Sequence, residues 1–461
     1  MLTVEKIGGT SMSRFEDVLK NIVFSPSRMG NYYGRIFVVS AYAGVTDMLL
    51  EHKKTGAPGI YARFAKKADY DTALDELLTR LLEINEGFAP LKLDLPKAEA
   101  FLRERIGKVR GCLQSMAEVL ASGYVDRQNI LLAAREVLAS IGESHAAYNT
   151  ADIVRKNGLD STFVDLGGFN DAEYLTINER IHKALAGIDF SRTVAVVTGY
   201  TKGTEGIMRE FDRGYSEVTF SKVAVEVKAA EAVIHKEYHL SSADPALVGL
   251  ENAVPVGFTN FDVADQLADI GMEAIHPKAS KPLENAGINI RIKNTFQPEH
   301  PGTLISKGYV GRQSRVEIIT GTDKVVVIEI HDPSMVGQVG FDRDIMQLFY
   351  EHRTSYIVKA TNANSISIVI WDKEKNASLI KELDGRYEQV TVKKAAVVCV
   401  LGTNIAIPGV LSRAAGALSA KGINIDVLSQ SLRQVNIQFV VDRDKYREAV
   451  VALHAVLCEK A

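Results

Sequence analysis

Short apolar runs alternate with helical stretches up to about residue 300, and this alternation constrains the fold more than any other feature of the chain. The runs at 35–46, 163–165 and 193–197 have the pattern of strands, and residues 47–141 are largely helical in pattern. Strands that alternate with helices predict an α/β fold with an open, mostly parallel sheet covered by helices on both faces. In such a sheet the ligand lies beyond the carboxyl ends of the strands.

Length, charge and cysteine content narrow the function classes. A chain of 461 residues is too long for one ordinary core and predicts two to four domains. The net charge of -3 argues against general nucleic-acid binding. No apolar run is long enough to cross a bilayer, and the N-terminus lacks the pattern of a secretory signal. Three widely spaced cysteines, Cys112, Cys399 and Cys458, argue against a disulfide framework or zinc cluster and favour a cytoplasmic location.

The N-terminus has the pattern of an anion-binding turn. Residues 2–7 predict a strand, the sequence Gly-Gly-Thr-Ser follows at 8–11, and a helical stretch runs from about 14 to 22. Glycines allow the backbone to approach a ligand, and the N–H groups at a helix start favour negative charge. Lys6 adds a flexible cation suited to phosphoryl oxygens. These residues alone leave a buried strand with a plain glycine turn as the alternative.

Beyond Pro298, Pro301 and Gly302 the pattern changes to two small repeated segments. Both have a β-α-β-β plan, which predicts two α+β modules. The expected elements are strands at 324–330 and 365–370 around a helix at 343–352, then strands at 395–400, 422–427 and 435–441 with helices at 410–420 and up to 458. Such modules often bind a regulator or another subunit, and a plain dimerisation or stability role stays open.

Several motifs together resemble those of the aspartate kinases, which have the amino-acid-kinase fold. They are Lys6–Ser11, Val38–Ala41 with Gly44–Thr46, Gly142-Glu143, Arg213 with Ser216, and Ile275–Pro277. The tail, with Pro408–Val410 followed by Lys421–Ile425, resembles the tandem ACT modules of the same enzymes. The resemblance covers essentially the whole chain. It implies an amino-acid-kinase catalytic domain at 1–300, a first ACT module at 305–390 and a second at 391–461.

The resemblance also implies an activity. An aspartate kinase transfers the ATP γ-phosphoryl group to the side-chain carboxylate of L-aspartate, giving 4-phospho-L-aspartate and ADP for aspartate-derived amino-acid or ectoine biosynthesis. Mg²⁺ is expected on the ATP phosphates, because no dedicated cage of carboxylates is visible in the sequence. The expected partners are a possible amino-acid effector at the ACT modules and further copies of the chain, in a homodimer or larger assembly through ACT pairing. Neither nucleic acid nor membrane is an expected partner.

The site residues that the resemblance implies fall into three groups. They are Lys6 and Glu217 as catalytic residues; Ser40, Thr46, Glu143, Arg213 and Ser216 at the substrate; and Lys6, Gly8, Gly9 and Ser11 at the ATP phosphates; no metal ligand is assigned. Lys6 would supply charge where the transition state develops it. The planar fork of Arg213 would bind the substrate α-carboxylate, and Glu143 would face the ammonium group.

Two further residues near the site have less direct roles. Glu217, where the family usually has aspartate, is expected to orient Lys6 or the substrate ammonium, and a helix-cap carboxylate is the alternative. His276 is expected to be structural, because the acceptor carboxylate is already ionised and needs no strong general base.

Some positions depart from the family pattern. Tyr215 replaces a glycine beside the substrate, Glu273 replaces a lysine, and Ala246 replaces an arginine. The nucleotide loop at 234–239 is altered, so no adenine-binding side chain is assigned, and backbone groups at 235–241 are expected to hold the adenine. The first ACT module has Thr-Asn-Ala-Asn at 361–364 where lysine- or threonine-regulated members have Thr-Ser-Glu. This departure predicts weak or absent inhibition by lysine and threonine and resembles the aspartate kinases that feed ectoine synthesis.

Two other functions stay open. The same fold could phosphorylate another acceptor, such as glutamate, acetylglutamate or a carbamate-type substrate, but Glu143 with Arg213 and the tandem ACT tail argue against this. The chain could instead be a non-catalytic amino-acid sensor, which only the altered nucleotide loop supports. The choice of acceptor tests the first alternative, and ATP turnover tests the second.

Overall fold

The computed structural model describes residues 1–52, 55–169, 171–211, 214–272 and 274–458. The chain divides into two compact units, which are described separately. Unit 1 comprises Met1–His239 and His276–Gly302, and unit 2 comprises Leu240–Ile275 and Thr303–Ala461. The domain boundaries expected at 300, 305 and 390–391 stay predictions. No helix in the described ranges has both the length and the apolar character needed to cross a membrane.

Unit 1 is built on a parallel sheet with the strand order β3-β4-β2-β1-β5-β7. The strands are β1 (Thr3–Ile7), β2 (Arg35–Val39), β3 (Ser161–Val164), β4 (Val194–Thr198), β5 (Glu231–Lys236) and β7 (Asn289–Asn294). Every residue of β2 and β4 is buried, as expected for central parallel strands. The predicted parallel α/β architecture is therefore confirmed, with β1 between β2 and β5 at its centre.

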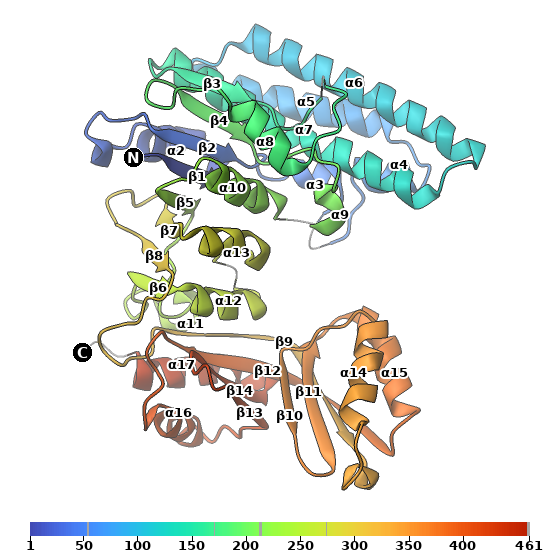
Figure 1. Ribbon diagram of the computed structural model, residues 1–461, viewed down its shortest axis with the longest axis vertical. Helices are drawn as coiled ribbons and strands as arrows, with labels where there is room; N and C mark the ends of the chain where they lie inside the picture. The colour runs from blue at the N-terminus through green and yellow to red at the C-terminus, as the bar shows by residue number, and fades with distance from the viewer. Residues whose placement is uncertain (53–54, 170, 212–213, 273, 459–461) are drawn as a thin grey trace. The chain divides into compact units, whose positions relative to one another are not determined.

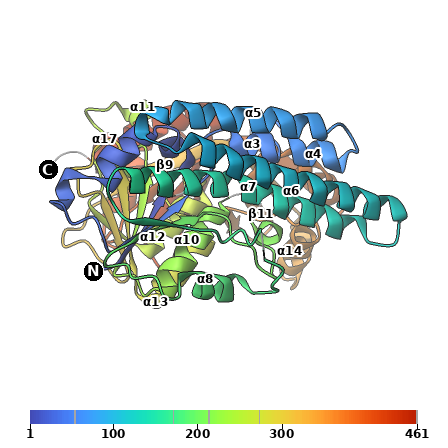
Figure 2. The same cartoon turned by 90° about the horizontal axis from the view of Figure 1, so that it is seen from above.

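Helices cover both faces of this sheet, some in direct contact with the strands and others packed on those helices. They are α1 (Gly9–Met12), α2 (Phe15–Val18), the π-helix η1 (Leu19–Val23), η2 (Pro26–Arg28), α3 (Val45–Leu49), α4 (Ile60–Ala65), α5 (Asp71–Gly87), η3 (Ala89–Leu91), α6 (Leu95–Ser122), α7 (Arg127–Lys156), α8 (Ile177–Leu185), α9 (Ile207–Glu210), α10 (Tyr215–Glu226) and α13 (Pro277–Ala286). The long helices α5, α6 and α7 lie side by side (Figures 1 and 2), and α7 contacts β2, β3 and β4. Leu74, Leu77 and Leu81 of α5 are fully buried at helical spacing, so this helix packs through one apolar stripe.

The helical stretch expected at about residues 14–22 is present as α2 followed directly by η1, which together cover residues 15–23. The structure adds a separate short helix, α1, from Gly9 to Met12. Arg14 has a non-helical backbone (φ -112°, ψ 54°) and separates α1 from α2. The Ser13 hydroxyl donates to Gly9 O (3.2 Å) and accepts from Ala43 N–H (2.8 Å). These local hydrogen bonds compete with helix continuation and explain the break.

Unit 2 contains a short parallel pair and a six-stranded antiparallel sheet with the order β10-β11-β9-β12-β14-β13. Its elements are α11 (Pro245–Val248), β6 (Phe258–Asn260), α12 (Phe261–Asp269), β8 (Thr303–Ser306), β9 (Ile318–His331), η4 (Pro333–Met335), α14 (Phe341–Glu351), β10 (Val358–Thr361), β11 (Ser365–Trp371), η5 (Glu374–Asn376), α15 (Ala377–Asp384), β12 (Gln389–Leu401), α16 (Val410–Ser419), β13 (Val427–Gln430), β14 (Asn436–Asp442), η6 (Arg443–Lys445) and α17 (Tyr446–Leu457). The antiparallel sheet confirms an α+β tail after the parallel sheet.

One long strand pair joins the two repeats of this sheet. The first part of β12 (389–395) pairs with 325–331 of β9, and its last part (397–401) pairs with 318–322, with a register shift between them. The expected boundary at 390–391 therefore falls inside one continuous strand. Each repeat gains a neighbouring strand from the other through this pairing, which ties the two repeats into a single sheet.

The strand expected at 422–427 is wrong, because the structure begins β13 only at Val427. Gly422 has a left-handed backbone (φ 67°), and Ile423 N–H donates to Leu418 O (3.0 Å). Both features belong to the closing turn of α16, so these residues complete a helix end before the strand can start. The apolar residues at 423 and 425 serve packing instead. Ile423 belongs to a hydrophobic core of unit 2, and Ile425 packs against that core.

Candidate active site

Lys6 and Glu217 are brought together at the carboxyl end of β1. The Lys6 Nζ lies 3.4 Å from the Glu217 Oε1, and both side chains are about 12% exposed. Glu217 lies in the first turn of α10, and its other oxygen accepts from the His276 backbone N–H at 2.8 Å. Burial works to raise the pKa of Glu217, but the charges of Lys6 and Lys236 and the His276 hydrogen bond outweigh it and lower the pKa. Glu217 is therefore an ionised carboxylate that holds the Lys6 ammonium in place.

His276 has a capping role in this structure. Its Nδ1 accepts from the Lys278 N–H at 3.2 Å at the start of α13, where Pro277 occupies the first helical position. The backbone N–H of His276 therefore binds Glu217, while its ring caps the start of α13. This arrangement links α13 to α10 on the Lys6 side of the sheet.

The glycine turn after β1 packs tightly against the loop that follows β2. A Cβ on Gly9 would lie 2.6 Å from Ala41 O, so only glycine fits there, whereas a Cβ on Gly8 would meet Glu237 and His235 at ordinary distances. The Gly8 and Gly9 backbone is partly exposed at the end of the strand. The turn therefore has the close-approach geometry expected of a phosphate-binding loop.

Ser11 lies deeper than the glycines and is fully buried. Its hydroxyl donates to Glu237 Oε1 at 3.2 Å and lies 3.1 Å from Thr295 Oγ1. In this structure Ser11 joins the start of α1 to the ends of β5 and β7. Its assignment to the ATP phosphates stays a prediction, and these contacts show which neighbours compete for its hydroxyl.

The side chains of Ser40 and Ser216 meet within hydrogen-bonding distance. The two hydroxyl oxygens lie 3.2 Å apart, Ser40 directly after β2 and Ser216 in the first turn of α10. Thr46 lies in the first turn of α3 and is partly exposed. Three of the predicted substrate residues therefore come from chain segments at or near the carboxyl ends of the central strands, as the parallel sheet requires.

Glu143 is a buried carboxyl group in the middle of α7. Its Oε2 accepts from the Tyr215 hydroxyl at 3.3 Å. Burial raises the pKa of Glu143 to about 8, although the Tyr215 hydrogen bond and the Lys6 charge oppose the shift. At neutral pH the group is therefore mostly protonated in the substrate-free chain. A buried carboxyl group with this property favours a cation brought by a ligand.

Sequence reasoning missed three contacts of this site. Tyr215 was noted only as a replacement for a glycine, but it is the hydrogen-bond donor to Glu143. Glu237 and Thr295 had no assigned role, and both contact Ser11. The signal available for Tyr215 was its place in the same helix as Ser216, one residue earlier. Arg213, predicted at the substrate, and Glu273, which departs from the family pattern, lie outside the described residues.

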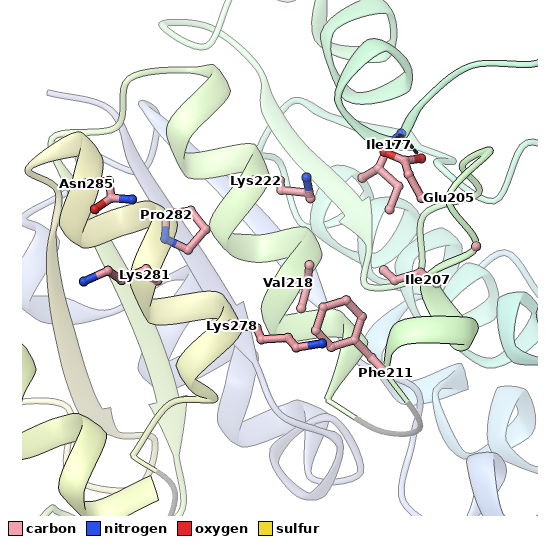
Figure 3. A pocket seen from close by; sticks show the side chains of 11 residues that line it. Ile177, Glu205, Ile207, Phe211, Val218, Lys222, Lys278, Lys281, Pro282 and Asn285 are labelled. Atoms are coloured by element: carbon pink, nitrogen blue, oxygen red, sulfur yellow. Dashed lines mark hydrogen bonds between the residues drawn. The ribbon is translucent and has the colours of Figure 1, made fainter. Parts of the chain in front are cut away.

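Two cavities of unit 1 lie apart from these residues. One, of about 390 Å³, lies between α10, α13 and the segment around α9, and is lined by Lys222, Lys278 and Phe211 among others. Figure 3 shows Lys278 reaching toward the Phe211 ring, and its Nζ lies 4.6 Å from the ring centroid. The other, of about 500 Å³, opens on the opposite face of the sheet from Lys6. Neither cavity is lined by the residues predicted at the phosphoryl group, the aspartate or the ATP phosphates, and the second is lined by His235, the first residue of the segment expected at the adenine.

A glycine at the end of β4 provides a direct test of how tightly the site is packed. A Cβ on Gly199 would lie 2.7 Å from Ser216 Cβ and from Val39 O, and 3.1 Å from Glu143 Cγ. We expect Gly199→Ala to displace Ser216 and Glu143 and to lower kcat/KM by about 10- to 100-fold, since overpacking costs about 1–3 kcal/mol. Gly416→Ala is the control, because a Cβ there would meet nothing within 4 Å. Steady-state kinetics measure the effect, and equal activity of the two variants would contradict it.

The comparisons with known proteins agree with this geometry. Residues 1–294 match the model of the amino acid kinase family, and residues 398–457 match an ACT domain model. The chain is 44% identical to aspartate kinase Ask_Ect of Stutzerimonas stutzeri (strain A1501), over 100% of this chain and 98% of the relative. It is 28% identical to the chloroplastic aspartokinase 1 of Arabidopsis thaliana, over 98% of this chain and 79% of that protein.

Solved structures share the fold. E. coli aspartokinase III in complex with aspartate and ADP matches with a TM-score of 0.73 and 20% identity, over 100% of both chains. The Clostridium acetobutylicum aspartate kinase matches with a TM-score of 0.69 and 21% identity, over 99% of both chains. At these identities the likeness concerns the fold alone.

The parallel sheet carries a glycine turn, a lysine and an ionised glutamate at its carboxyl edge. These features are typical of proteins that transfer phosphoryl groups, and the family match identifies which family this is. The chain belongs to the amino acid kinase family and, within it, to the aspartate kinases. The expected activity class, transfer of a phosphoryl group to a carboxyl acceptor, follows from this membership.

Proposed function

We propose that this aspartate kinase uses ATP to phosphorylate the side-chain carboxylate of L-aspartate, with the residue roles expected from the sequence. The observation that carries the proposal is Glu143. It is buried and its pKa is about 8, and its hydrogen bonds within the described residues come from the Tyr215 phenol and from backbone groups of Glu143 and Ala41, none of which is a cation. An amino-acid ammonium would supply the positive charge that this carboxyl group needs. Arg213, expected at the substrate α-carboxylate, lies outside the described residues.

The reaction requires positioning and charge. A carboxylate oxygen of aspartate attacks the γ-phosphorus, the bond from that phosphorus to the β–γ bridging oxygen breaks, and ADP leaves with the electron pair. Lys6 lies where its charge can offset the negative charge that develops on the phosphoryl oxygens. Glu217 orients Lys6, and the Ser40–Ser216 pair offers hydroxyl groups to the substrate. Correct positioning of the two reactants contributes about 7–11 kcal/mol at best.

ATP binding involves the glycine turn, and we expect Mg²⁺ to accompany it. Within the described residues, no cluster of three or more His, Cys, Asp and Glu side chains could hold a metal ion. The donor set therefore does not fit a dedicated protein site, and no step of the reaction is derived through the metal. Mg²⁺ held by phosphate oxygens and water is consistent with this donor set. Backbone groups at 235–241 are proposed to hold the adenine.

Hydroxylamine trapping tests the proposed reaction. With ATP, Mg²⁺ and L-aspartate, we expect ADP release together with formation of an aspartyl hydroxamate. L-Glutamate is the control acceptor and should give at most a small fraction of this signal. Trapping with glutamate and not aspartate would contradict the choice of acceptor, and ADP release with neither would favour the sensor function.

We further propose that lysine and threonine inhibit this enzyme weakly or not at all. E. coli aspartokinase III has been solved in complex with lysine and aspartate. Here the end of β10 and the turn after it read Thr-Asn-Ala-Asn at 361–364, where regulated members have Thr-Ser-Glu. Asn364 instead contacts the β9 end, with its Nδ2 3.3 Å from His331 Nε2. We expect initial rates in 10 mM lysine, threonine or both to stay within about twofold of the uninhibited rate, since a 1.4 kcal/mol coupling would already change them tenfold. A sigmoidal loss of activity at millimolar lysine would contradict this.

The pathway and assembly are part of the same proposal. The departures in the first ACT module and the 44% identity to Ask_Ect support the type of aspartate kinase that feeds ectoine synthesis. We propose a cytoplasmic homodimer or larger assembly, formed through the ACT sheets. Light scattering of the full chain would measure the assembly directly.

A further inference from the structure

The face of the sheet opposite Lys6 has an unusual concentration of buried charge. Side chains alternate along a strand, so Glu5 points away from the face that carries its neighbour Lys6. In the parallel register Glu5 stands beside Val233 of β5, which in turn stands beside Arg291 of β7. Arg35 of β2 is on the same face, two residues along. Charged side chains from four adjacent strands therefore gather on one face, at a distance from the candidate active site.

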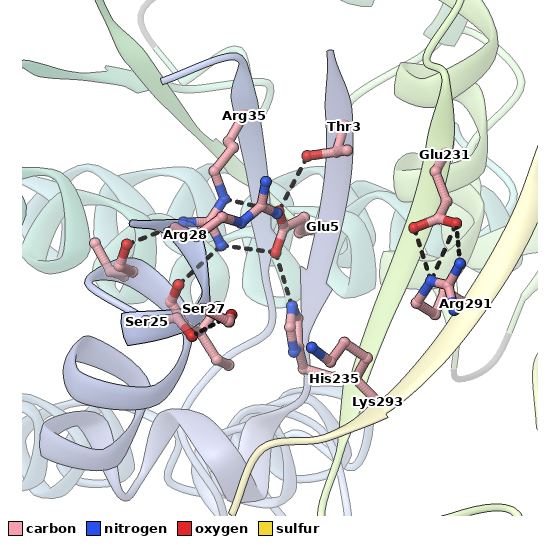
Figure 4. Close-up of polar contacts among 12 residues, drawn as sticks. Thr3, Glu5, Ser25, Ser27, Arg28, Arg35, Glu231, His235, Arg291 and Lys293 are labelled. Carbon is pink, nitrogen blue, oxygen red and sulfur yellow. Dashed lines mark hydrogen bonds and ion pairs between the residues drawn. The ribbon is translucent and has the colours of Figure 1, made fainter. Parts of the chain in front are cut away.

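Glu5 is the centre of this cluster and is 1% exposed. Arg35 binds it through two nitrogens at 2.7 and 2.8 Å, Arg28 donates to it at 2.8 Å, and His235 Nε2 lies 2.8 Å away (Figure 4). Burial opposes ionisation, but Arg35 and the hydrogen bonds hold the pKa of Glu5 well below its usual value. One ionised carboxylate is thus already saturated by two guanidinium groups.

The cluster borders the cavity of about 500 Å³, a volume in the range of small-molecule sites. Its ionisable lining residues include the cations Arg28, Arg35, Arg291 and Lys293 and the carboxylates Glu5 and Glu231. Glu231 is paired with Arg291 at 2.7 Å. The pKa of His235 is lowered by burial, so this side chain is neutral near pH 7. Among the lining side chains, four cations face two carboxylates, which leaves an excess of two positive charges.

This excess is concentrated at the cavity side of the cluster. Lys293 donates to the Pro298 carbonyl at 3.1 Å, a neutral acceptor. Burial lowers the pKa of Lys293, and repulsion from Arg28 and Arg291 lowers it further against the attraction of Glu5 and Glu299. Burial and the charge of Arg35 likewise lower the pKa of Arg28, against the attraction of Glu5 and Glu231. Lys293 is thus repelled by two other half-buried cations, Arg28 and Arg291, around one hollow, and a bound anion would relieve this repulsion.

We propose that this cavity is a binding site for a small dianion, held by Lys293, Arg28 and Arg291 on the face of the sheet opposite the candidate active site. Two chemical sources carry such a charge, a phosphate group and a dicarboxylate. Guanidinium forks bind the oxygens of both groups in pairs, so the residues specify the charge and the oxygen-rich character of the ligand. The ligand would be a regulator or a stabilising ion, since none of the residues predicted at the phosphoryl group, the aspartate or the ATP phosphates lines the cavity, and only His235 of the segment proposed at the adenine does.

Calorimetric titration of the full chain tests this site. The protein is first saturated with a non-hydrolysable ATP analogue and aspartate, so that the phosphate positions at Lys6 are filled. Inorganic phosphate and succinate are then titrated separately, with acetate as the monoanion control. We expect one dianion per chain to bind, at least tenfold more tightly than acetate. Binding of phosphate alone identifies the source as a phosphate group, and binding of succinate alone identifies a dicarboxylate.

Single substitutions test whether the dianion binds in this cavity. Lys293→Gln and Arg28→Gln should each weaken dianion binding by at least tenfold, whereas Lys20→Gln should leave it unchanged. Lys20 is exposed, lies one residue before the cavity-lining Asn21, and does not line the cavity, so it controls for the loss of one charge. Thermal midpoints without ligand confirm that each variant is folded. Absence of dianion binding to the unmodified chain, or unchanged binding in both cavity variants, would overturn the proposal.

Discussion

Replacing Lys6 with glutamine is expected to lower kcat by about 10²- to 10³-fold, with smaller changes in the KM values for ATP and aspartate. This is the loss measured when one group that stabilises transition-state charge is removed from a preorganised site. The Lys6 ammonium is nearly buried and is held by Glu217, whose second oxygen is in turn fixed by the His276 N–H. Little reorganisation is therefore needed when charge develops on the transferring group. Steady-state kinetics at saturating aspartate measure the effect.

Two further variants make this prediction specific. Glu217→Gln removes the carboxylate that orients Lys6 but keeps the cation, so we expect a smaller loss in kcat, of about 10-fold. Lys20→Gln removes an exposed lysine and should leave kcat unchanged. A Lys6→Gln enzyme with kcat within threefold of the unmodified enzyme would show that Lys6 does not act on the phosphoryl group.

The sequence predicts the fold correctly wherever a strand or helix can be recognised from its own residues. Fully buried runs such as β2 and β4 can be recognised from their own residues, and their alternation with helices is sufficient to predict a parallel sheet. The strand expected at 422–427 was wrong because Gly422 and Ile423 close a helix through backbone hydrogen bonds, which an apolar pattern does not reveal. Boundaries of this kind depend on turn chemistry more than on hydrophobicity.

The site was predictable only in part, for a related reason. Lys6 and Glu217 lie 211 residues apart, and only the family resemblance placed them together before the structure did. The hydrogen bond from Tyr215 to Glu143 joins two helices and depends on a residue that departs from the family pattern. The charged cluster around Glu5 was missed completely, because Glu5, Arg35 and Lys293 come from three strands and become neighbours only in the sheet register.

The pH dependence of aspartate use should report the ionisation of Glu143. Burial raises the pKa of this group to about 8, so below pH 8 most free enzyme carries a neutral carboxyl group. The substrate ammonium requires the ionised form, and kcat/KM for aspartate should therefore rise up to tenfold per pH unit from pH 6 and level off above pH 8. In contrast, kcat at saturating aspartate should vary less, because bound substrate holds Glu143 ionised.

Glu143→Gln separates this group from others that titrate in the same range. Above pH 8 the substitution should lower kcat/KM for aspartate by about 10²- to 10⁴-fold, because removing one partner of a buried ion pair costs about 3–5 kcal/mol. The deficit should shrink by up to tenfold for each pH unit below 8, since the unmodified enzyme then loses the same charge by protonation. The variant itself should lack the slope that Glu143 causes.

Tyr215→Phe provides the matched variant for the pKa. The Tyr215 hydroxyl donates to Glu143 and lowers its pKa, so removing the hydroxyl raises that pKa. The midpoint of the kcat/KM profile should therefore move to higher pH, while the plateau changes by less than in Glu143→Gln. A midpoint that moves to lower pH, or an unmodified enzyme with a flat profile between pH 6 and 8.5, would exclude Glu143 as the group that binds the ammonium. A shifted midpoint with a preserved plateau would instead assign to Tyr215 the tuning of this carboxyl group.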